Sequence, residues 1–342
     1  MTPTYMKIIS YIEDLILSGK VLAGEKLPSE SDLAKLFSTT RITVRRALDD
    51  LEKRGIITRV PSVGTFVREI NIVSTKRIGI LVNNHHILYG ASQFLTSVGA
   101  RIFTVPREHQ THGGSLSEEK ALNTLMSYSI NGLIIEPTEL TSKCQKLNDL
   151  LLSNFPVVFV DREINTVKKV PTVLSDNYEG GRMLGEHFRK VHKSKNSLFV
   201  TSEDLQISSV AERYRGICDG VKKQVEVFYV ESIDGDFSEL VRKIKQDKHD
   251  TIFFCNDMLA IRGAFFLLKN DILIPQDVMI SGFDNDFVAK MSEPKLTTVR
   301  QDLALVGEVA ASQLVELLKG EKIESRILLK TELIVRNSCG CK

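Results

Sequence analysis

The stretch Ser38–Ile57, STTRITVRRALDDLEKRGII, predicts a helix with two different faces. Its apolar residues follow the helical spacing i, i+3, i+4 and i+7: Val44, Ala47, Leu48 and Leu51. Its cationic and hydroxyl side chains lie off this stripe, toward the start of the helix: Arg41, Thr43, Arg45 and Arg46. We therefore expect the second half of the helix to be buried and the first half to face a polyanion.

The flanking sequence predicts a small domain around this helix. Two amphipathic helices precede it, over residues 3–17 and about 29–37, and the second begins at Ser29 with a capping-box pattern. This second helix is predicted to turn three apolar residues inward: Leu33, Leu36 and Phe37. Two short strands follow, over 56–60 and 65–68. Three helices and a β-hairpin form a winged helix-turn-helix, whose recognition helix enters the major groove of DNA with its N-terminal residues.

The charge distribution agrees with nucleic-acid binding by this region. The whole chain has 45 Lys and Arg against 43 Asp and Glu, whereas residues 38–68 hold seven basic and three acidic side chains. A local basic face of this kind is the electrostatic footprint of nucleic-acid binding. We expect Arg41, Thr43 and Arg45 to reach base edges and the remaining basic groups to hold phosphates.

Length and composition set the domain organisation and the compartment. A chain of 342 residues exceeds the size at which single cores stop growing. We place a DNA-binding domain at 1–70, a linker at 71–76 and a second domain at 77–342. The five cysteines are scattered, the first 20 residues lack the apolar core of a signal peptide, and no apolar run is long enough for a membrane span. These features favour a cytoplasmic protein without a membrane partner.

The N-terminal motifs KLPSESDLAKLF, TTRITVRRALDDLEKRGII and GTFV occur together and in the order typical of one family. Over residues 1–68 the sequence resembles the DNA-binding domain of the GntR-type bacterial regulators. The resemblance implies DNA contact by eight residues: Ser29, Glu30, Arg41, Thr43, Arg45, Arg46, Gly64 and Thr65. The chain departs from the family at Ser62, where the family's wing has a glycine.

Beyond residue 75, short apolar runs alternate with amphipathic segments. Eight runs are predicted strands: 77–82, 101–105, 132–136, 157–160, 197–200, 225–230, 251–255 and 278–283. This alternation predicts an α/β fold of two doubly wound lobes, whose ligands bind beyond the carboxyl ends of the strands. Polar residues follow several of these ends: Glu136, Asp161, Arg162, Asn256, Asp257 and Asp284.

The same segments resemble the effector-binding body of the LacI/GalR regulators, which is itself similar to periplasmic sugar-binding proteins. The motifs include PVVFVDREI, VLSDNYEGGRMLGEHF, ERYRGICDG and ISGFDNDFVAK. A GntR-type head on such a body is most similar to the arabinose repressors of Gram-positive bacteria. The resemblance implies a repressor that binds operator DNA as a homodimer, pairs through helices near 302–318 and the first lobe, and is released by a small sugar, L-arabinose. It implies five effector contacts: Glu136, Asp161, Arg213, Asn256 and Asp284.

These residue types suit a neutral polyol, because a guanidinium or a carboxylate can engage two neighbouring hydroxyls. Another sugar, a sugar phosphate or a purine remains an alternative effector. The chain has no Trp, so an aromatic platform would come from Phe159, Tyr178 or Phe283, for which core packing is the competing interpretation. After Asn84 the loop is shorter than in the resembling proteins, so that one contact is missing or is replaced by His85 or His86.

Catalysis and metal binding are the less favoured interpretations. The sequence contains no G-x-G-x-x-G, P-loop or G-x-S-x-G motif, which disfavours a sugar kinase or dehydrogenase and predicts no cofactor. No metal is expected at His85-His86 or at His109-x-x-His112, which lack neighbouring carboxylates or cysteines. Cys339-Gly-Cys341 could bind a metal or change redox state, but we interpret it as a solvated tail because zinc sites need four ligands.

Overall fold

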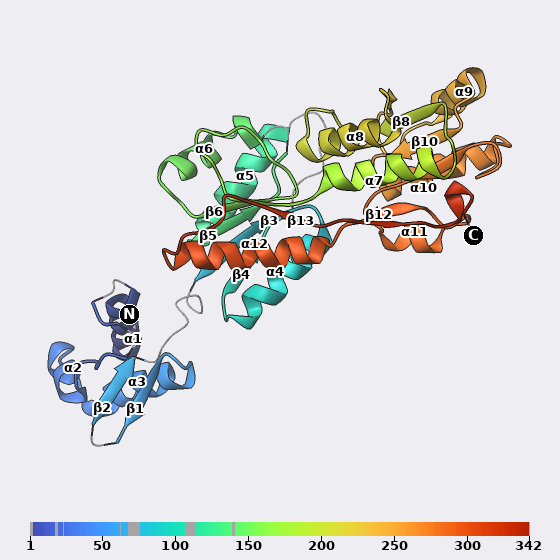
Figure 1. Ribbon diagram of the computed structural model, residues 1–342. Coiled ribbons are helices and arrows are strands. Elements are labelled where there is room, and N and C mark those ends of the chain that lie inside the picture. Colours follow the sequence, from blue (N-terminus) through green and yellow to red (C-terminus); the bar gives the residue numbers. More distant parts are fainter. Residues whose placement is uncertain are drawn as a thin grey trace. The chain divides into compact units, whose positions relative to one another are not determined.

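The computed structural model describes residues 3–17, 20–22, 24–61, 63–67, 76–106, 114–138 and 141–341. The chain divides into two compact units, Met1–Thr75 and Lys76–Lys342 (Figure 1). Most of the predicted linker lies outside the described residues, as do Ser62, His109 and His112.

The first unit is the predicted winged helix-turn-helix. Its elements are α1 (Thr4–Leu17), α2 (Glu30–Leu36), α3 (Arg41–Lys53) and an antiparallel hairpin of β1 (Ile57–Val60) and β2 (Gly64–Val67). The apolar stripe of α3 is buried as predicted, and it packs with Ile8 and Ile12 of α1 and Leu33 of α2. The Ser29 capping box is also confirmed, since the Ser29 side chain accepts from the Asp32 backbone N–H.

The prediction that Leu36 points inward is wrong. Its side chain is 57% exposed, whereas Leu33 is buried and Phe37 packs edge-on against Tyr11 at 5.4 Å between ring centroids. Helix α2 has only seven residues, and the body of the unit covers only one side of it. Leu36 lies at the margin of the apolar stripe and so extends beyond that cover.

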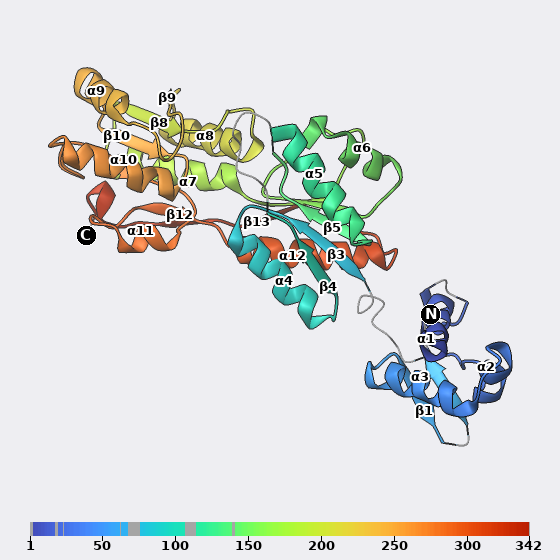
Figure 2. The ribbon, with the colours of Figure 1, turned by 180° about the vertical axis from the view of Figure 1, so that it is seen from behind.

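The second unit begins with a lobe built on a six-stranded parallel sheet. Its strands, in spatial order, are β13 (Arg326–Leu329), β7 (Thr172–Ser175), β6 (Val157–Val160), β5 (Gly132–Ile135), β3 (Arg77–Leu81) and β4 (Arg101–Thr104). Its helices are α4 (His85–Ser97), α5 (Gly114–Ser127), α6 (Gln145–Leu152) and α12 (Leu303–Leu318), with the short η2 (Thr141–Lys143) (Figure 2). The sheet therefore combines strands from the middle of the chain with one from near its C-terminus.

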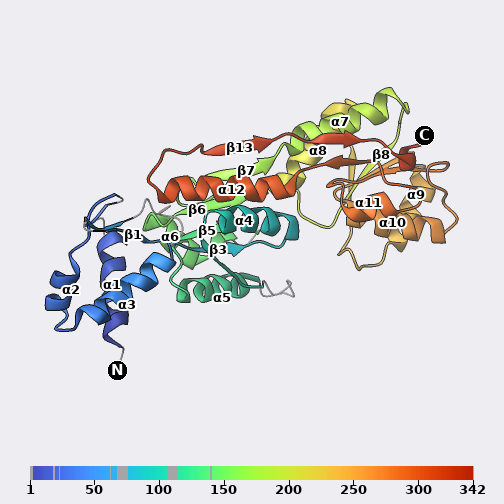
Figure 3. The ribbon, with the colours of Figure 1, turned by 90° about the horizontal axis from the view of Figure 1, so that it is seen from below.

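Helices α4 and α12 of this lobe lie side by side (Figure 3). They approach so closely that a Cβ atom on Gly90 would overlap the backbone of Ala304, and one on Gly307 would overlap the backbone of Ile87. Glycine at these two positions allows backbone-to-backbone packing between the helices.

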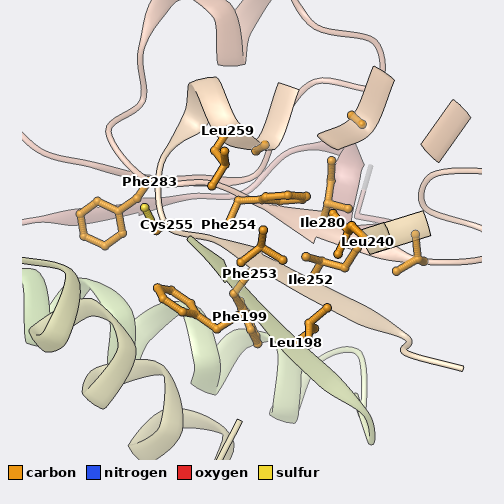
Figure 4. Close-up of a cluster of buried hydrophobic side chains, with 14 of the residues drawn as sticks. Leu198, Phe199, Leu240, Ile252, Phe253, Phe254, Cys255, Leu259, Ile280 and Phe283 are labelled. Atoms are coloured by element: carbon orange, nitrogen blue, oxygen red, sulfur yellow. The ribbon is translucent and has the colours of Figure 1, made fainter. Parts of the chain in front are cut away.

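The second lobe is built on a four-stranded parallel sheet in the order β11 (Met279–Ser281), β10 (Thr251–Phe254), β8 (Ser197–Thr201) and β9 (Glu226–Tyr229). Its helices are α7 (Asn177–Lys190), α8 (Ser208–Val221), α9 (Ser238–Asp247), α10 (Asp257–Lys269) and α11 (Phe287–Met291). Its core includes Phe199, Phe253, Phe254 and Phe283 (Figure 4). The two doubly wound lobes and their parallel sheets confirm the predicted fold class.

The prediction from sequence missed four short strands and misjudged the C-terminus. The missed strands are β7, β13 and the antiparallel pair β12 (Thr298–Arg300) and β14 (Glu332–Ile334). The C-terminal segment is not a solvated tail: it forms η3 (Asn337–Cys339), and Cys339 is 0% exposed. Among the described residues, no helix is long and apolar enough to cross a bilayer.

Candidate DNA-binding and effector-binding sites

The start of α3 presents the predicted DNA-binding side chains on a capped helix end. Thr40 is the N-cap, and its hydroxyl accepts from the Thr43 backbone N–H at 3.3 Å and lies 3.1 Å from the Thr43 hydroxyl. Arg41 donates from Nη2 to the Ser31 hydroxyl at 2.6 Å. The capped first turn thus holds Arg41 and Thr43 beside the start of α2.

Arg45 and Arg46 diverge from this point. Arg45 is exposed and pairs with Glu30, with 2.9 Å between Nε and Oε2. Arg46 lies over the Tyr5 ring of α1, at 4.3 Å from its centroid. The structure therefore groups Ser29, Glu30, Arg41, Thr43 and Arg45 around the junction of α2 and α3. Arg46 lies toward α1, and Gly64 and Thr65 lie on the wing strand β2.

Two basic residues of segment 38–68 form ion pairs within the first unit. Arg59 pairs with Asp49 and with Glu52, the latter at 2.8 Å. Arg54 pairs with Glu13 and Asp50. These two guanidinium groups are therefore engaged in ion pairs within the unit.

Sequence reasoning missed Ile42, whose side chain is 79% exposed in the first turn of α3. A β-branched apolar residue off the buried stripe was the signal that could have found it. Such a side chain can contact the methyl group of thymine.

In the second unit, Arg213 forms the centre of the predicted effector site. It lies on α8, is only 7% exposed, and donates from Nε to Asn177 Oδ1 at 2.8 Å and from Nη1 to the Cys255 carbonyl at 2.7 Å. The guanidinium lies over the Phe283 ring at 4.1 Å from its centroid. These contacts fix the plane of the guanidinium and direct Nη2 toward Asp284, at 3.6 Å from Oδ1.

Asp284 follows β11 and has a positive φ of 118°, which turns its side chain back toward Arg213. Gln301 donates to its Oδ1 at 2.5 Å. Loss of hydration within the cleft raises the pKa of Asp284 to about 6, although Arg213 and the Gln301 hydrogen bond act to lower it. The side chain keeps 27% exposure, so a small molecule can still reach it.

In the first lobe, Arg162 interacts electrostatically with two of the predicted effector contacts, Asp161 and Glu136. Arg162 Nε donates to Asp161 Oδ2 at 3.1 Å, and Glu136 accepts from the backbone N–H of Asn83 at 2.7 Å. Burial would lower the pKa of Arg162, but the carboxylates of Asp161, Glu203 and Glu136 together raise it. The charge of Asp161 in turn acts to raise the pKa of Asp284, so the two lobes share one electrostatic cluster.

Asn256 has a structural role in addition to its position at the site. It is the N-cap of α10, and its Oδ1 accepts from the Leu259 backbone N–H at 2.8 Å. Sequence reasoning missed three residues that hold the cluster in place: Asn177, Glu203 and Gln301. Asn177 follows a strand that was itself missed, and Gln301 follows another, so neither was recognised as a strand-end residue.

The aromatic candidates and His86 differ in their surroundings. Phe159 and Phe283 are buried core residues, although Phe283 also lies beneath Arg213. The Tyr178 hydroxyl donates to Asp219 at 2.8 Å. His86 Nε2 lies 3.9 Å from Asp286 Oδ1, so the start of α4 does reach across to the second lobe.

A hollow of about 610 Å³ opens between the lobes beside this cluster. Thr138 and Arg162 line it from the first lobe, and Gln206 and Ser208 line it from the second. Arg213 and Asp284 lie outside this lining. The hollow is therefore a separate place where a small molecule could be held.

Comparison with known proteins agrees with this architecture. Residues 4–67 match the model of the bacterial regulatory proteins of the gntR family, and residues 196–339 match that of a periplasmic binding protein-like domain. The transcription regulator CcpA of Lactococcus lactis has a similar fold, with a TM-score of 0.68 at 20% identity over 77% of this chain and 99% of that one. These matches define a bacterial regulatory protein with a GntR-type head and a periplasmic-binding-protein-like body.

Two relatives match both units together. An arabinose metabolism transcriptional repressor of Geobacillus stearothermophilus is 30% identical, covering 98% of this chain and 97% of the relative. A protein of the same description from Halalkalibacterium halodurans is 27% identical, covering 99% and 97%. The chain belongs to this family of transcriptional repressors, and it is not an enzyme.

Proposed function

We propose that this chain represses transcription as a homodimer bound to operator DNA and that a small sugar, L-arabinose, releases it. In this proposal α3 enters the major groove, with Arg41, Thr43, Arg45 and Ile42 at base edges. Ser29, Glu30, Arg46, Gly64 and Thr65 then act at or near the phosphates. Two such heads would match a palindromic operator with half-sites about 34–36 Å apart.

The observation that carries the effector part is the buried guanidinium of Arg213 directed at Asp284. Asn177 and the Cys255 carbonyl hold two of its nitrogens, which leaves the edge toward Asp284 for a ligand. A guanidinium edge beside a carboxylate suits neighbouring sugar hydroxyls, which accept from the first and donate to the second. Glu136, Asp161 and Asn256 would complete the contacts from both lobes.

The proposed release depends on coupling between two distant sites. A sugar that contacts both lobes stabilises the arrangement in which they are close together. In that arrangement the spacing of the two heads would no longer match the two half-sites of the operator. The sugar then lowers DNA affinity by as much as its own affinity favours that arrangement. Helix α12 and the adjacent face of the first lobe would form the dimer contact.

Thermal unfolding of the purified chain against a ligand panel tests the effector. The panel contains L-arabinose, other pentoses, hexoses, sugar phosphates and purines. A ligand at about 100 times its Kd adds about 2.7 kcal/mol, which raises Tm by several degrees. We expect a shift with L-arabinose, and release of a fluorescent operator duplex at the same concentrations.

Two variants locate the site. Arg213→Ala should abolish the shift, and Gln206→Ala, in the lining of the neighbouring hollow, should leave it intact. A shift with another ligand would replace L-arabinose as the effector. The reverse pattern of the two variants would move the binding site into the hollow.

A further inference from the structure

The C-terminal segment and the end of helix α7 bring together four side chains that can bind a metal. His187 lies in the last turn of α7, and His192 follows two residues after its end. Cys339 ends η3, and Cys341 lies two residues further on. Their ligand atoms all lie within 4.8 Å of one another.

Three of the distances between these atoms are close to the edges of a zinc tetrahedron, and the others lie within 4.8 Å. The two histidine Nε2 atoms are 3.2 Å apart, Cys339 Sγ is 3.6 Å from His187 Nε2, and Cys341 Sγ is 3.5 Å from His192 Nε2. Zinc bonds of about 2.3 Å to sulfur and about 2.0–2.1 Å to nitrogen separate sulfur from nitrogen by about 3.5 Å and two nitrogens by about 3.3 Å in tetrahedral geometry. The four side chains therefore need little movement to enclose an ion.

Packing and backbone contacts around the four side chains support this geometry, in addition to the hydrogen-bond contacts between the side chains themselves. Gly340 has a φ of 90°, a left-handed conformation that turns the chain between the two cysteines. The Ser338 hydroxyl accepts from the Thr297 N–H at 2.8 Å and donates to the Ile280 carbonyl at 2.7 Å, which fixes the segment on the lobe. Both imidazoles pack against Phe188, with ring centroids 5.5 Å away.

We propose that His187, His192, Cys339 and Cys341 bind one Zn²⁺ ion in a closed structural site. Two thiolates and two neutral imidazoles form a donor set of the kind found in zinc sites, and the two negative charges balance the ion. Each thiol releases its proton to solvent as its sulfur binds the metal. Four protein ligands leave no open position, so the ion joins the C-terminus to α7 and does no chemistry.

The position of the site gives the ion a consequence for the second lobe. Helix α7 carries His187 at one end, and Asn177, which holds Arg213, at the other. The C-terminal segment contacts β11, which leads to Asp284. Zinc would thus tie together two elements that position the proposed effector site.

A second cluster provides an internal control. Glu226, Asp247 and His249 also lie together, but the Lys243 ammonium is already 2.6 Å from Glu226 and 2.8 Å from Asp247. The lysine supplies the positive charge that a metal would bring. We expect no zinc at this second cluster.

Metal analysis of the untagged full-length chain tests the proposal. The protein is equilibrated with Zn²⁺ in the presence of a phosphine reductant, which keeps the thiols reduced, and is then separated from free metal. Elemental mass spectrometry measures the zinc bound per chain. Competition with a chromophoric chelator gives the affinity, and Co²⁺ substitution reports tetrahedral thiolate coordination through its visible spectrum. The variants are Cys341→Ser and His192→Asn, both at partly exposed positions, with Cys218→Ser and Glu226→Gln as controls.

We expect about one zinc per chain in the parent and in both controls. Loss of one ligand should weaken zinc binding about 100-fold or more, and chelation should lower Tm by about 5 °C in the parent but not in the ligand variants. Circular dichroism establishes that the variants are folded. The proposal is overturned if the parent retains no more zinc than Cys341→Ser and His192→Asn do, or if Glu226→Gln is the substitution that removes the metal.

Discussion

Arg162 of the first lobe donates to Glu203 of the second, with 2.8 Å between Nη2 and Oε1. A second link lies beside it, where the Glu163 backbone N–H donates to the Ser208 hydroxyl at 2.7 Å. The two lobes are therefore joined directly across the cleft. Arg162 also pairs with Asp161, so this joint is continuous with the proposed effector site.

We expect Glu203→Gln to weaken effector binding about fivefold. The substitution replaces a half-buried ion pair between the lobes with a weaker neutral contact, which costs about 1 kcal/mol of the close arrangement. Isothermal titration with the effector measures the change. Glu239→Gln, which removes an exposed pair with Arg242 on α9, is the control and should have no effect. Equal or tighter binding by Glu203→Gln would show that the ion pair does not favour the binding arrangement.

Arg213→Lys should lower effector affinity about 10- to 100-fold. A lysine keeps the charge but cannot reach Asn177, the Cys255 carbonyl and a ligand at once, and lost hydrogen bonds to a charged group cost about 1.5–3 kcal/mol. Arg215→Lys, on the exposed side of the same helix, is the matched control. If both variants bind alike, the planar fork of Arg213 is not what the ligand contacts.

Effector affinity should fall as the pH drops below about 6. The pKa of Asp284 is raised to about 6, so its carboxyl takes up a proton in the folded chain well above its ordinary range. Protonation of Asp284 stabilises the folded chain without ligand. This stabilisation is fully present below about pH 4, the ordinary range of the carboxyl, and is lost as the pH rises through about 6. Protonation also removes an acceptor for sugar hydroxyls, so affinity changes in the opposite direction.

Titrations between about pH 5 and 7.5 measure this dependence. Asp284→Asn should bind more weakly throughout and should lose the change near pH 6. A parent affinity that is flat over this range would exclude Asp284 as an ionised contact.

Arg45→Ala should weaken operator binding and reduce its dependence on salt. Each phosphate contact that is lost lowers the slope of log K against log salt by about 1, whereas loss of a base contact costs about 1–3 kcal/mol on the specific site. Fluorescence anisotropy at several salt concentrations separates the two. Arg54→Ala, which breaks internal pairs with Glu13 and Asp50, should lower stability but leave the salt slope unchanged.

Periodicity and motif order were enough to predict the fold of both units. The apolar stripe of α3 and the alternation of apolar runs with helices are regular patterns over short stretches of chain. They can therefore be recognised in the sequence. Strands β7, β12, β13 and β14 could not be seen in this way. They have three or four residues each, and β7 carries Thr172 and Ser175 inside a buried strand.

Apart from Arg213, which the family resemblance implied, site residues were predictable only where a polar residue follows an apolar run. Asp161, Asn256 and Asp284 satisfy that rule, whereas Gln301 and Glu203 depend on which loops face one another. The cluster at Cys339 shows the same limit more strongly. Its histidines are about 150 positions earlier in the chain, and no local spacing relates them to the C-terminus.

The close approach of Gly90 to Ala304 and of Gly307 to Ile87 couples α4 and α12 backbone to backbone. No side chain lies between the helices at these points, so neither helix can slide past the other by a change of rotamer. We therefore expect a displacement at the first turn of α4, where His86 faces Asp286, to be transmitted to α12. The cleft and the far face of the first lobe would thus be mechanically coupled through these two helices.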